Sequence, residues 1–194
     1  MQISTNVEPF IQHRNLLFVR GLFLSVVGFC VFVLSVINPE LTIMSSPNWL
    51  PVIAFTLIVT GILESIDSIV ARKTTLFLIY TNLAIVDLVT GIIILFELYT
   101  HPKSLVLLTT AFLFIKGLFR IVAALNTRQP NYKALIITGV ISLILGLVLW
   151  QGVPENHAVT FISICIAIDL TIRGIALLSF SLWLRTLNKS SVNQ

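Results

Sequence analysis

The chain has 194 residues, of which 57% are hydrophobic and only 10% are charged. Its mean hydropathy is +1.01, whereas in soluble domains about a quarter of the residues are charged. The composition therefore excludes an ordinary soluble domain. The net charge of +4 comes mainly from basic residues at the ends of apolar segments, so it does not indicate a nucleic-acid partner.

Six apolar segments of roughly 20 residues follow one another along the chain, each long enough to cross a hydrocarbon core of ~30 Å. In chain order they cover residues 16–37, 49–70, 75–98, 104–125, 132–151 and 157–184. They lack the alternation with a period of two that membrane β-strands show. We therefore predict an all-α integral membrane domain over residues 16–184, with cytoplasmic tails at 1–15 and 185–194.

Glycine and proline recur in these segments with a threefold pattern. A glycine in the middle of an odd-numbered segment precedes a proline at the following turn, and the next segment carries a second glycine. The three sets are Gly28, Pro39 and Gly61; Gly91, Pro102 and Gly117; and Gly146, Pro154 and Gly174. The pattern predicts three parallel two-helix hairpin repeats, at about 16–70, 75–125 and 132–184, in which the six glycines let helices pack closely.

Basic residues are distributed unevenly between the two sides of the predicted membrane domain. Lys103 is the basic residue expected on the side of the proline turns. The side shared by the two termini has Arg14, Arg20, Arg72, Lys73, Arg128, Lys133, Arg185 and Lys189. Because cytoplasmic loops are enriched in Lys and Arg, we expect both termini in the cytoplasm.

Seven charged residues lie inside the predicted spans, where charge is costly. They are Glu64, Asp67, Asp87, Lys116, Arg120, Asp169 and Arg173. Asp67 is near enough to the basic rim to reach the headgroups, so we expect the other six to form an intramembrane charge network. Asp169 precedes Arg173 by four residues, a spacing that favours a pair within one helix.

Depth along each helix, counted at ~1.5 Å per residue, indicates further partners. Glu64 and Arg120 fall at the same depth and follow their segment's glycine by three residues, so we predict that they contact each other. Asp87 falls nearly level with Lys116 and Arg173, and either of these can neutralise it.

Two interpretations of these charges are open. In the first, ion pairs clamp the helices together in a medium of low dielectric constant. In the second, the charges form a polar path or a proton-sensitive switch, because burial favours the neutral form of an acid. The seven residues include four acids and three bases, and the spare acid keeps the second interpretation open. A third arrangement, in which the charges face a partner subunit, is less favoured.

No group of residues in the sequence matches an enzyme or cofactor site. The two cysteines fall in mid-span and belong to no redox or metal motif. His101 and His157 lie at turns near Glu97 and Glu155, but their spacing does not match that of metal-ligand pairs. We therefore predict a protein that is not an enzyme and has no catalytic residues, no cofactor and no metal site.

The glycine and proline positions, between about Arg20 and Leu182, resemble those of the HdeD-like family of bacterial acid-resistance membrane proteins. That family has a short two-helix membrane repeat with a central glycine in each helix and a proline at the outer turn. The resemblance implies a multi-pass protein of the bacterial inner membrane that is linked to acid or general stress. It supplies no catalytic residues.

Two functions follow from these observations. The first is a non-enzymatic inner-membrane protein of acid or stress resistance, surrounded by the lipid bilayer and clamped by its ion pairs. The alternative is a small transporter or channel with a proton- or ion-linked polar path. Dry, ion-paired surroundings of Asp87 and Asp169 favour the first function, and a hydrated cavity favours the second. The sequence names no solute, and it leaves open association with a second copy or another membrane protein.

Overall fold

A computed structural model describes residues 14–38, 42–43, 46–47, 49–70, 77–97, 102–127, 132–152 and 157–192. These ranges contain six α-helices and one short antiparallel pair of strands. The helices are α2 (Arg14–Ile37), α3 (Leu50–Val70), α4 (Phe77–Glu97), α5 (Pro102–Thr127), α6 (Tyr132–Trp150) and α7 (Ala158–Val192). The strands are β1 (Thr42–Ile43) and β2 (Ser46–Pro47).

The helices agree closely with the apolar segments of the sequence. Four of them, α2, α5, α6 and α7, are long and apolar enough to cross a membrane, while α3 and α4 contain shorter apolar stretches at Leu50–Ile66 and Thr81–Phe96. Many large apolar side chains of these helices are exposed, among them Phe29, Ile69 and Phe96. Such an exposed apolar surface is suited to lipid and not to water. The chain therefore has the features of a multi-pass membrane protein.

Several residues used in the sequence analysis lie outside the described part of the chain. They include Pro39, Pro154 and Glu155, and the links 71–76 and 128–131 that carry basic residues. Pro102 is the first residue of α5. The last helix continues to Val192, although its apolar part ends at Arg185, close to the predicted end of the sixth segment.

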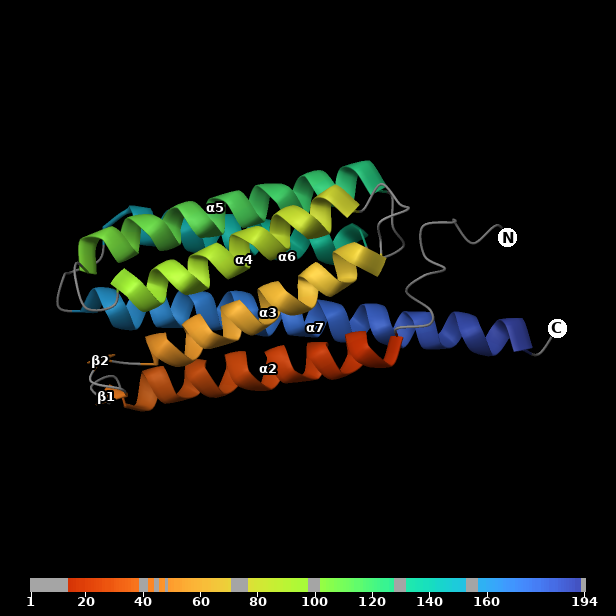
Figure 1. Ribbon diagram of the computed structural model, residues 1–194, viewed down its shortest axis with the longest axis horizontal. Helices are drawn as coiled ribbons and strands as arrows, with labels where there is room; N and C mark the ends of the chain where they lie inside the picture. The colour runs from red at the N-terminus through yellow and green to blue at the C-terminus, as the bar shows by residue number, and fades with distance from the viewer. Residues whose placement is uncertain are drawn as a thin grey trace.

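The six helices run side by side along the long axis of the molecule (Figure 1). β1 and β2 lie at one end, which we call the strand end; there α2 and α4 finish and α3 and α7 start. We call the opposite end, where α2 starts, the terminal end. α7 projects beyond the other helices at the terminal end (Figure 1).

The closest helix pairs are not the expected hairpins. α2 packs most extensively on α7, α3 on α4, and α5 on α6, whereas α2 and α3 scarcely touch. Each close pair thus joins helices from two different predicted repeats, and the first helix pairs with the last. The tight packing follows the glycines, because helices approach most closely where no Cβ separates their backbones.

The three close pairs share one packing register. In each pair, the central glycine of α3, α5 or α7 faces two residues of the partner helix. These two residues lie seven and three positions before the central glycine of the partner helix. These contacts join Gly61 to Ala84 and Leu88, Gly117 to Gly139 and Leu143, and Gly174 to Gly21 and Ser25. The same geometry therefore occurs three times among the described helices.

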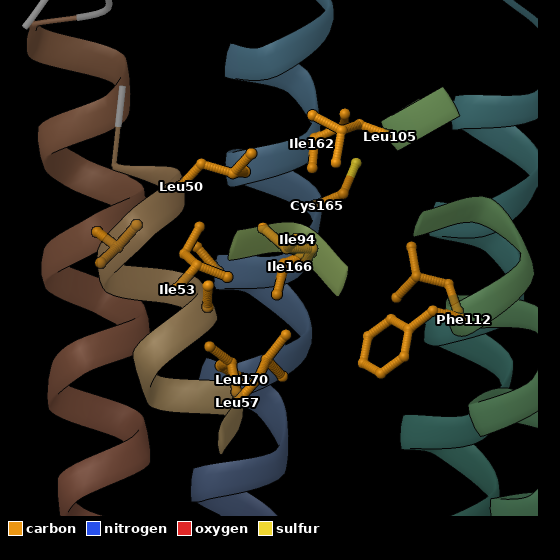
Figure 2. Packing of buried hydrophobic residues seen from close by; sticks show 14 of the residues in the cluster. Leu50, Ile53, Leu57, Ile94, Leu105, Phe112, Ile162, Cys165, Ile166 and Leu170 are labelled. Carbon is orange, nitrogen blue, oxygen red and sulfur yellow. The ribbon is translucent and has the colours of Figure 1, made fainter. Parts of the chain in front are cut away.

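The interior of the bundle is divided into an apolar half and a charged half. Near the strand end, side chains of α3, α4, α5 and α7 turn toward one another and form a hydrophobic cluster (Figure 2). Its fully buried members include Leu50, Ile53, Leu57, Ile94, Leu105, Ile162 and Ile166. The buried charges lie mainly beyond this cluster, toward the terminal end. Most of them, namely Arg20, Glu64, Lys116 and Arg120, lie nearer to the terminal end of their helices, and Asp87 lies at the middle of α4.

Candidate functional site: a buried charge network

Side chains from all six helices meet in one polar cluster, which we call the charge network. Its members are Arg20 of α2, Glu64 of α3, Asp87 of α4, Lys116 and Arg120 of α5, Ser142 of α6, and Asp169 and Arg173 of α7. All eight side chains are buried. The six intramembrane residues predicted from the sequence are therefore brought together, and Arg20 and Ser142 join them.

Asp169 has three partners in the network, Arg120, Ser142 and Lys116. Arg120 Nη1 donates to Asp169 Oδ1 at 2.6 Å, and Arg120 Nη2 donates to Oδ2 at 3.2 Å. Ser142 Oγ donates to Asp169 Oδ1 at 2.5 Å and accepts a hydrogen bond of 2.7 Å from Arg120 Nη1. This bidentate arrangement uses the planar guanidinium of Arg120, which fits a carboxylate better than an ammonium group does.

Lys116 connects Asp169 to Asp87. Its Nζ lies 2.6 Å from Asp87 Oδ1 and 3.4 Å from Asp169 Oδ2. The ammonium group also lies 4.6 Å from the centre of the Phe112 ring, which offers it a cation–π contact. Lys116 and Asp87 are both 0% exposed, so water does not solvate this ion pair.

Arg173 continues the network on the other side of Asp87. Its guanidinium pairs with both Asp87 and Glu64. Glu64 in turn pairs with Arg20, whose Nη2 lies 3.2 Å from Glu64 Oε1. This pair joins α2 to α3, two helices whose backbones scarcely touch.

The charged side chains alternate in sign along the network. The order is Arg120, Asp169, Lys116, Asp87, Arg173, Glu64 and Arg20. Each anion lies between two cations, which compensates its desolvation better than a single partner could. Among the described side chains the network has four cations and three anions, whereas the sequence predicted a spare acid. The difference arises because Arg20 is a member and because the side chain of Asp67 lies outside the described part.

Two predicted partnerships are wrong. Glu64 pairs with Arg20 and Arg173, and Arg120 pairs with Asp169, so Glu64 and Arg120 are not partners in the described structure. Asp169 and Arg173 also turn to other helices instead of to each other. Depth along a helix places residues at one level but does not say which face of the helix each occupies. Asp87, in contrast, meets both Lys116 and Arg173, the two cations at its level.

The sequence analysis missed the roles of Arg20 and Ser142. It counted Arg20 among the cytoplasmic basic residues, but this side chain is buried. A signal was present, because Arg20 directly precedes Gly21 just as Lys116 and Arg173 directly precede their glycines.

The position of Ser142 in the sequence also indicates that it belongs to the network. It lies four residues before Gly146, as Asp87 lies four residues before Gly91. Aligning the helices on their glycines therefore places a buried polar residue of the network at this position in both α4 and α6.

The geometry is suited to holding helices together and offers no metal-binding cluster among the described residues. Cys165 is buried in the hydrophobic cluster and Cys30 is exposed on α2. His157 is exposed at the start of α7, while the side chains of His101, Glu97 and Glu155 lie outside the described part. The charge network is therefore the candidate functional site.

Comparison with known proteins finds one family that matches part of the chain. Residues 83–150 match a family described as a short repeat of unknown function (DUF308). The match spans α4 from Leu83, α5 and α6, and it includes Asp87, Lys116, Arg120 and Ser142 of the charge network. HdeD-like proteins belong to this repeat family, so the match agrees with the resemblance at the level of the repeat. No curated protein and no solved structure matches the chain.

Proposed function

We propose that this chain is a non-enzymatic, six-span protein of a bacterial inner membrane, of the HdeD-like type, with both termini in the cytoplasm. Its three predicted hairpin repeats form one bundle that the charge network clamps. Its proposed role is resistance to acid or general stress. The observation that carries the structural part is the alternating series of charges contributed by α2, α3, α4, α5 and α7, to which α6 is joined through Ser142. The stress role rests on the family resemblance and on the repeat match.

The physical reason for a clamp is the low dielectric constant of the bundle interior. An ion pair there is strong, and a single unpaired charge is very unfavourable. Any sliding or rotation of one helix would separate a carboxylate from its cations. A network that joins all six helices therefore favours one arrangement of the bundle over the alternatives that purely apolar packing would permit.

Transport is the second candidate. Buried charges that reach the middle of a membrane domain often mark an ion path. Two observations count against an open path. The hydrophobic cluster near the strand end is packed, and the side chains of Asp87 and Asp169 are only 0% and 2% exposed. Dry, ion-paired surroundings of Asp87 and Asp169 are what we expect if the charges act as a clamp. Transport would require the hydrophobic cluster to separate.

The proposed stress role is tested in a strain that lacks the gene. We expect the deletion to reduce survival after an acid challenge while growth at neutral pH remains normal. Wild-type protein and the Thr109→Val variant, whose residue is buried outside the network, should restore survival at equal protein levels. Normal survival of the deletion strain in acid would contradict the stress role.

The Asp87→Asn and Asp169→Asn variants then separate two mechanisms. If the network responds to protonation, these variants fail to restore acid survival at wild-type protein levels. If it acts only as a clamp, survival follows the amount of folded protein. The channel alternative is tested with purified protein in liposomes that contain a pH-sensitive dye. After a change of external pH, the internal pH should change rapidly if the protein is a proton channel and should stay constant if it is only a clamp.

A further inference from the structure

The line of close contacts between α2 and α7, which we call the α2–α7 seam, ends in two arginines at the terminal end. Along the seam, residues of α2 spaced by seven each face two residues of α7. These contacts join Gly28 to Ala167 and Thr171, and Gly21 to Gly174 and Leu178. The next residue of this series is Arg14, which the same register places opposite Ser181 and Arg185. The Ser181 hydroxyl donates a hydrogen bond of 2.9 Å to the Arg14 carbonyl oxygen, so the register continues to the end of the seam.

Arg14 distinguishes this helix pair from the other two. It lies fourteen residues before the central glycine of α2, and the residues at the same position in α4 and α6 are Phe77 and Tyr132. Arg185 is not exceptional, because an arginine follows the central glycine of α3, α5 and α7 by eleven residues in each case. At these two positions the α2–α7 pair therefore has two arginines, where the other pairs have one arginine and one aromatic residue.

Both arginines lie at the ends of membrane spans. The apolar span of α2 begins at Arg14, and that of α7 ends at Arg185. Trp183, two residues before Arg185, is half-buried and stacks on Phe180. Tryptophan is typical of the membrane interface, which agrees with this level. The two arginines are therefore at the level of the phospholipid headgroups.

An aromatic ring positions the guanidinium of Arg185. Its Cζ lies 4.4 Å from the centre of the Phe18 ring, which is a cation–π contact. Phe18 lies on α2 one turn after Arg14. Stacking uses the face of the planar guanidinium and leaves the N–H groups along its edge available to an acceptor.

The two positive charges have no carboxylate partner in the described part of the chain. The ion pairs of the described residues do not include Arg14 or Arg185. Both side chains are half-buried, so water screens their mutual repulsion only in part. An anion beside them would remove this repulsion, and guanidinium groups recognise phosphate with paired hydrogen bonds.

We propose that Arg14 and Arg185 bind the headgroup phosphate of an anionic phospholipid at the end of the α2–α7 seam, with Phe18 positioning Arg185. The ligand is a lipid and not a soluble anion, because both arginines lie at the ends of membrane spans. An anionic headgroup fits better than a zwitterionic one, whose ammonium group the arginines would repel. The site is separate from the charge network and does not depend on the stress role.

Native mass spectrometry of the purified protein in detergent measures the affinity for single lipids. Phosphatidylglycerol and phosphatidylcholine with identical acyl chains are added in increasing amounts. We expect the first phosphatidylglycerol to bind more tightly than the first phosphatidylcholine. Arg14→Gln and Arg185→Gln should each weaken phosphatidylglycerol binding about fivefold, the usual contribution of one basic residue at a lipid surface. Binding of phosphatidylcholine should not change.

Two further variants separate a built site from diffuse attraction. Phe18→Leu keeps every charge but removes the ring beneath Arg185, so it should also weaken phosphatidylglycerol binding. Phe29→Leu is its matched control, because Phe29 is an exposed residue of α2 outside the seam. Arg185→Lys keeps the charge without the planar guanidinium and should weaken binding as well. It makes the same test if Phe18→Leu does not fold, which thermal unfolding detects.

Lys133→Gln is the control for charge alone, since Lys133 is an exposed basic residue at the start of α6. The proposal is wrong if this change weakens phosphatidylglycerol binding as much as Arg185→Gln does, or if Phe18→Leu and Arg185→Lys both bind like wild type. Displacement of phosphatidylglycerol by inorganic phosphate would assign the site to a soluble anion instead. Binding by Glu8→Gln but not by wild type would assign it to the carboxylate of the preceding segment.

Discussion

Asp87 occupies the centre of the charge network, with Lys116 on one side and Arg173 on the other. Each of these cations also reaches a second carboxylate, so the loss of Asp87 would leave both only partly compensated. In the interior of a membrane domain neither cation can recover its hydration. The stability of the bundle should therefore depend more on Asp87 than on any exposed charge.

We predict that Asp87→Asn lowers the free energy of unfolding by about 3–5 kcal/mol, the usual effect of breaking a buried ion pair. Adding Lys116→Met should restore part of the loss, with a coupling of about 0.5–3 kcal/mol between the two positions. Unfolding of the purified protein in mixed micelles measures both values. Thr109→Val serves as a control for buried changes outside the network, and strictly additive effects of the two substitutions would contradict the assigned pair.

At the scale of the helices, the glycines decide how closely each pair packs. Gly28 lies directly against the backbone of α7, whereas Gly146 faces α5 with room for an additional methyl group. The two residues have the same position in the sequence pattern, so they form a matched comparison. The effect of a Cβ at each one reports the local distance between helices.

We predict that Gly28→Ala destabilises the protein by about 1–3 kcal/mol, because the new methyl group would lie 2.7 Å from Thr171 N and 2.9 Å from Ala167 O, and the helices must separate. Gly146→Ala should be neutral, or stabilising by up to about 1 kcal/mol, because alanine favours the helix over glycine. Thermal unfolding in detergent compares them. Equal losses at both positions would show that the α5–α6 pair is as closely packed as the others.

At the scale of the whole molecule, the interior has an apolar half near the strand end and a charged half toward the terminal end. The proposed topology places the charged half on the cytoplasmic side, where basic residues also predominate in the sequence. The hydrophobic cluster then separates the charges from the opposite side of the membrane. The orientation can be tested independently of any function.

We predict that a membrane-impermeant thiol reagent added outside the cell labels Ser46→Cys and Asn156→Cys but not Asn126→Cys, in a protein with Cys30→Ser and Cys165→Ala. The reason is the predominance of basic residues beside the links that we place in the cytoplasm. Labelling after membrane permeabilisation confirms that position 126 is reactive. The reverse pattern would mean that both termini lie outside the cytoplasm.

The sequence by itself determined the helices and identified six of the buried charges. Long apolar segments must form helices in a membrane to satisfy their backbone hydrogen bonds, so the bounds of α2 to α7 were predictable within a few residues. Charges such as Asp87 and Lys116 inside these segments were recognisable as buried. A charged side chain in a membrane span is too costly to face lipid, so it turns to the interior of the bundle. The glycines were likewise recognisable as packing positions.

Only the tertiary structure decided which residues meet. Pairing α2 with α7 instead of α3 brings Arg20 and Arg173 to Glu64, and the rotation of α5 turns Arg120 to Asp169 and Ser142. Partners on different helices depend on how each helix is rotated and on which neighbours it has, and periodicity along one segment contains neither quantity. The wider spacing of α5 and α6 at Gly146 arises in the same way, from the contact between two helices.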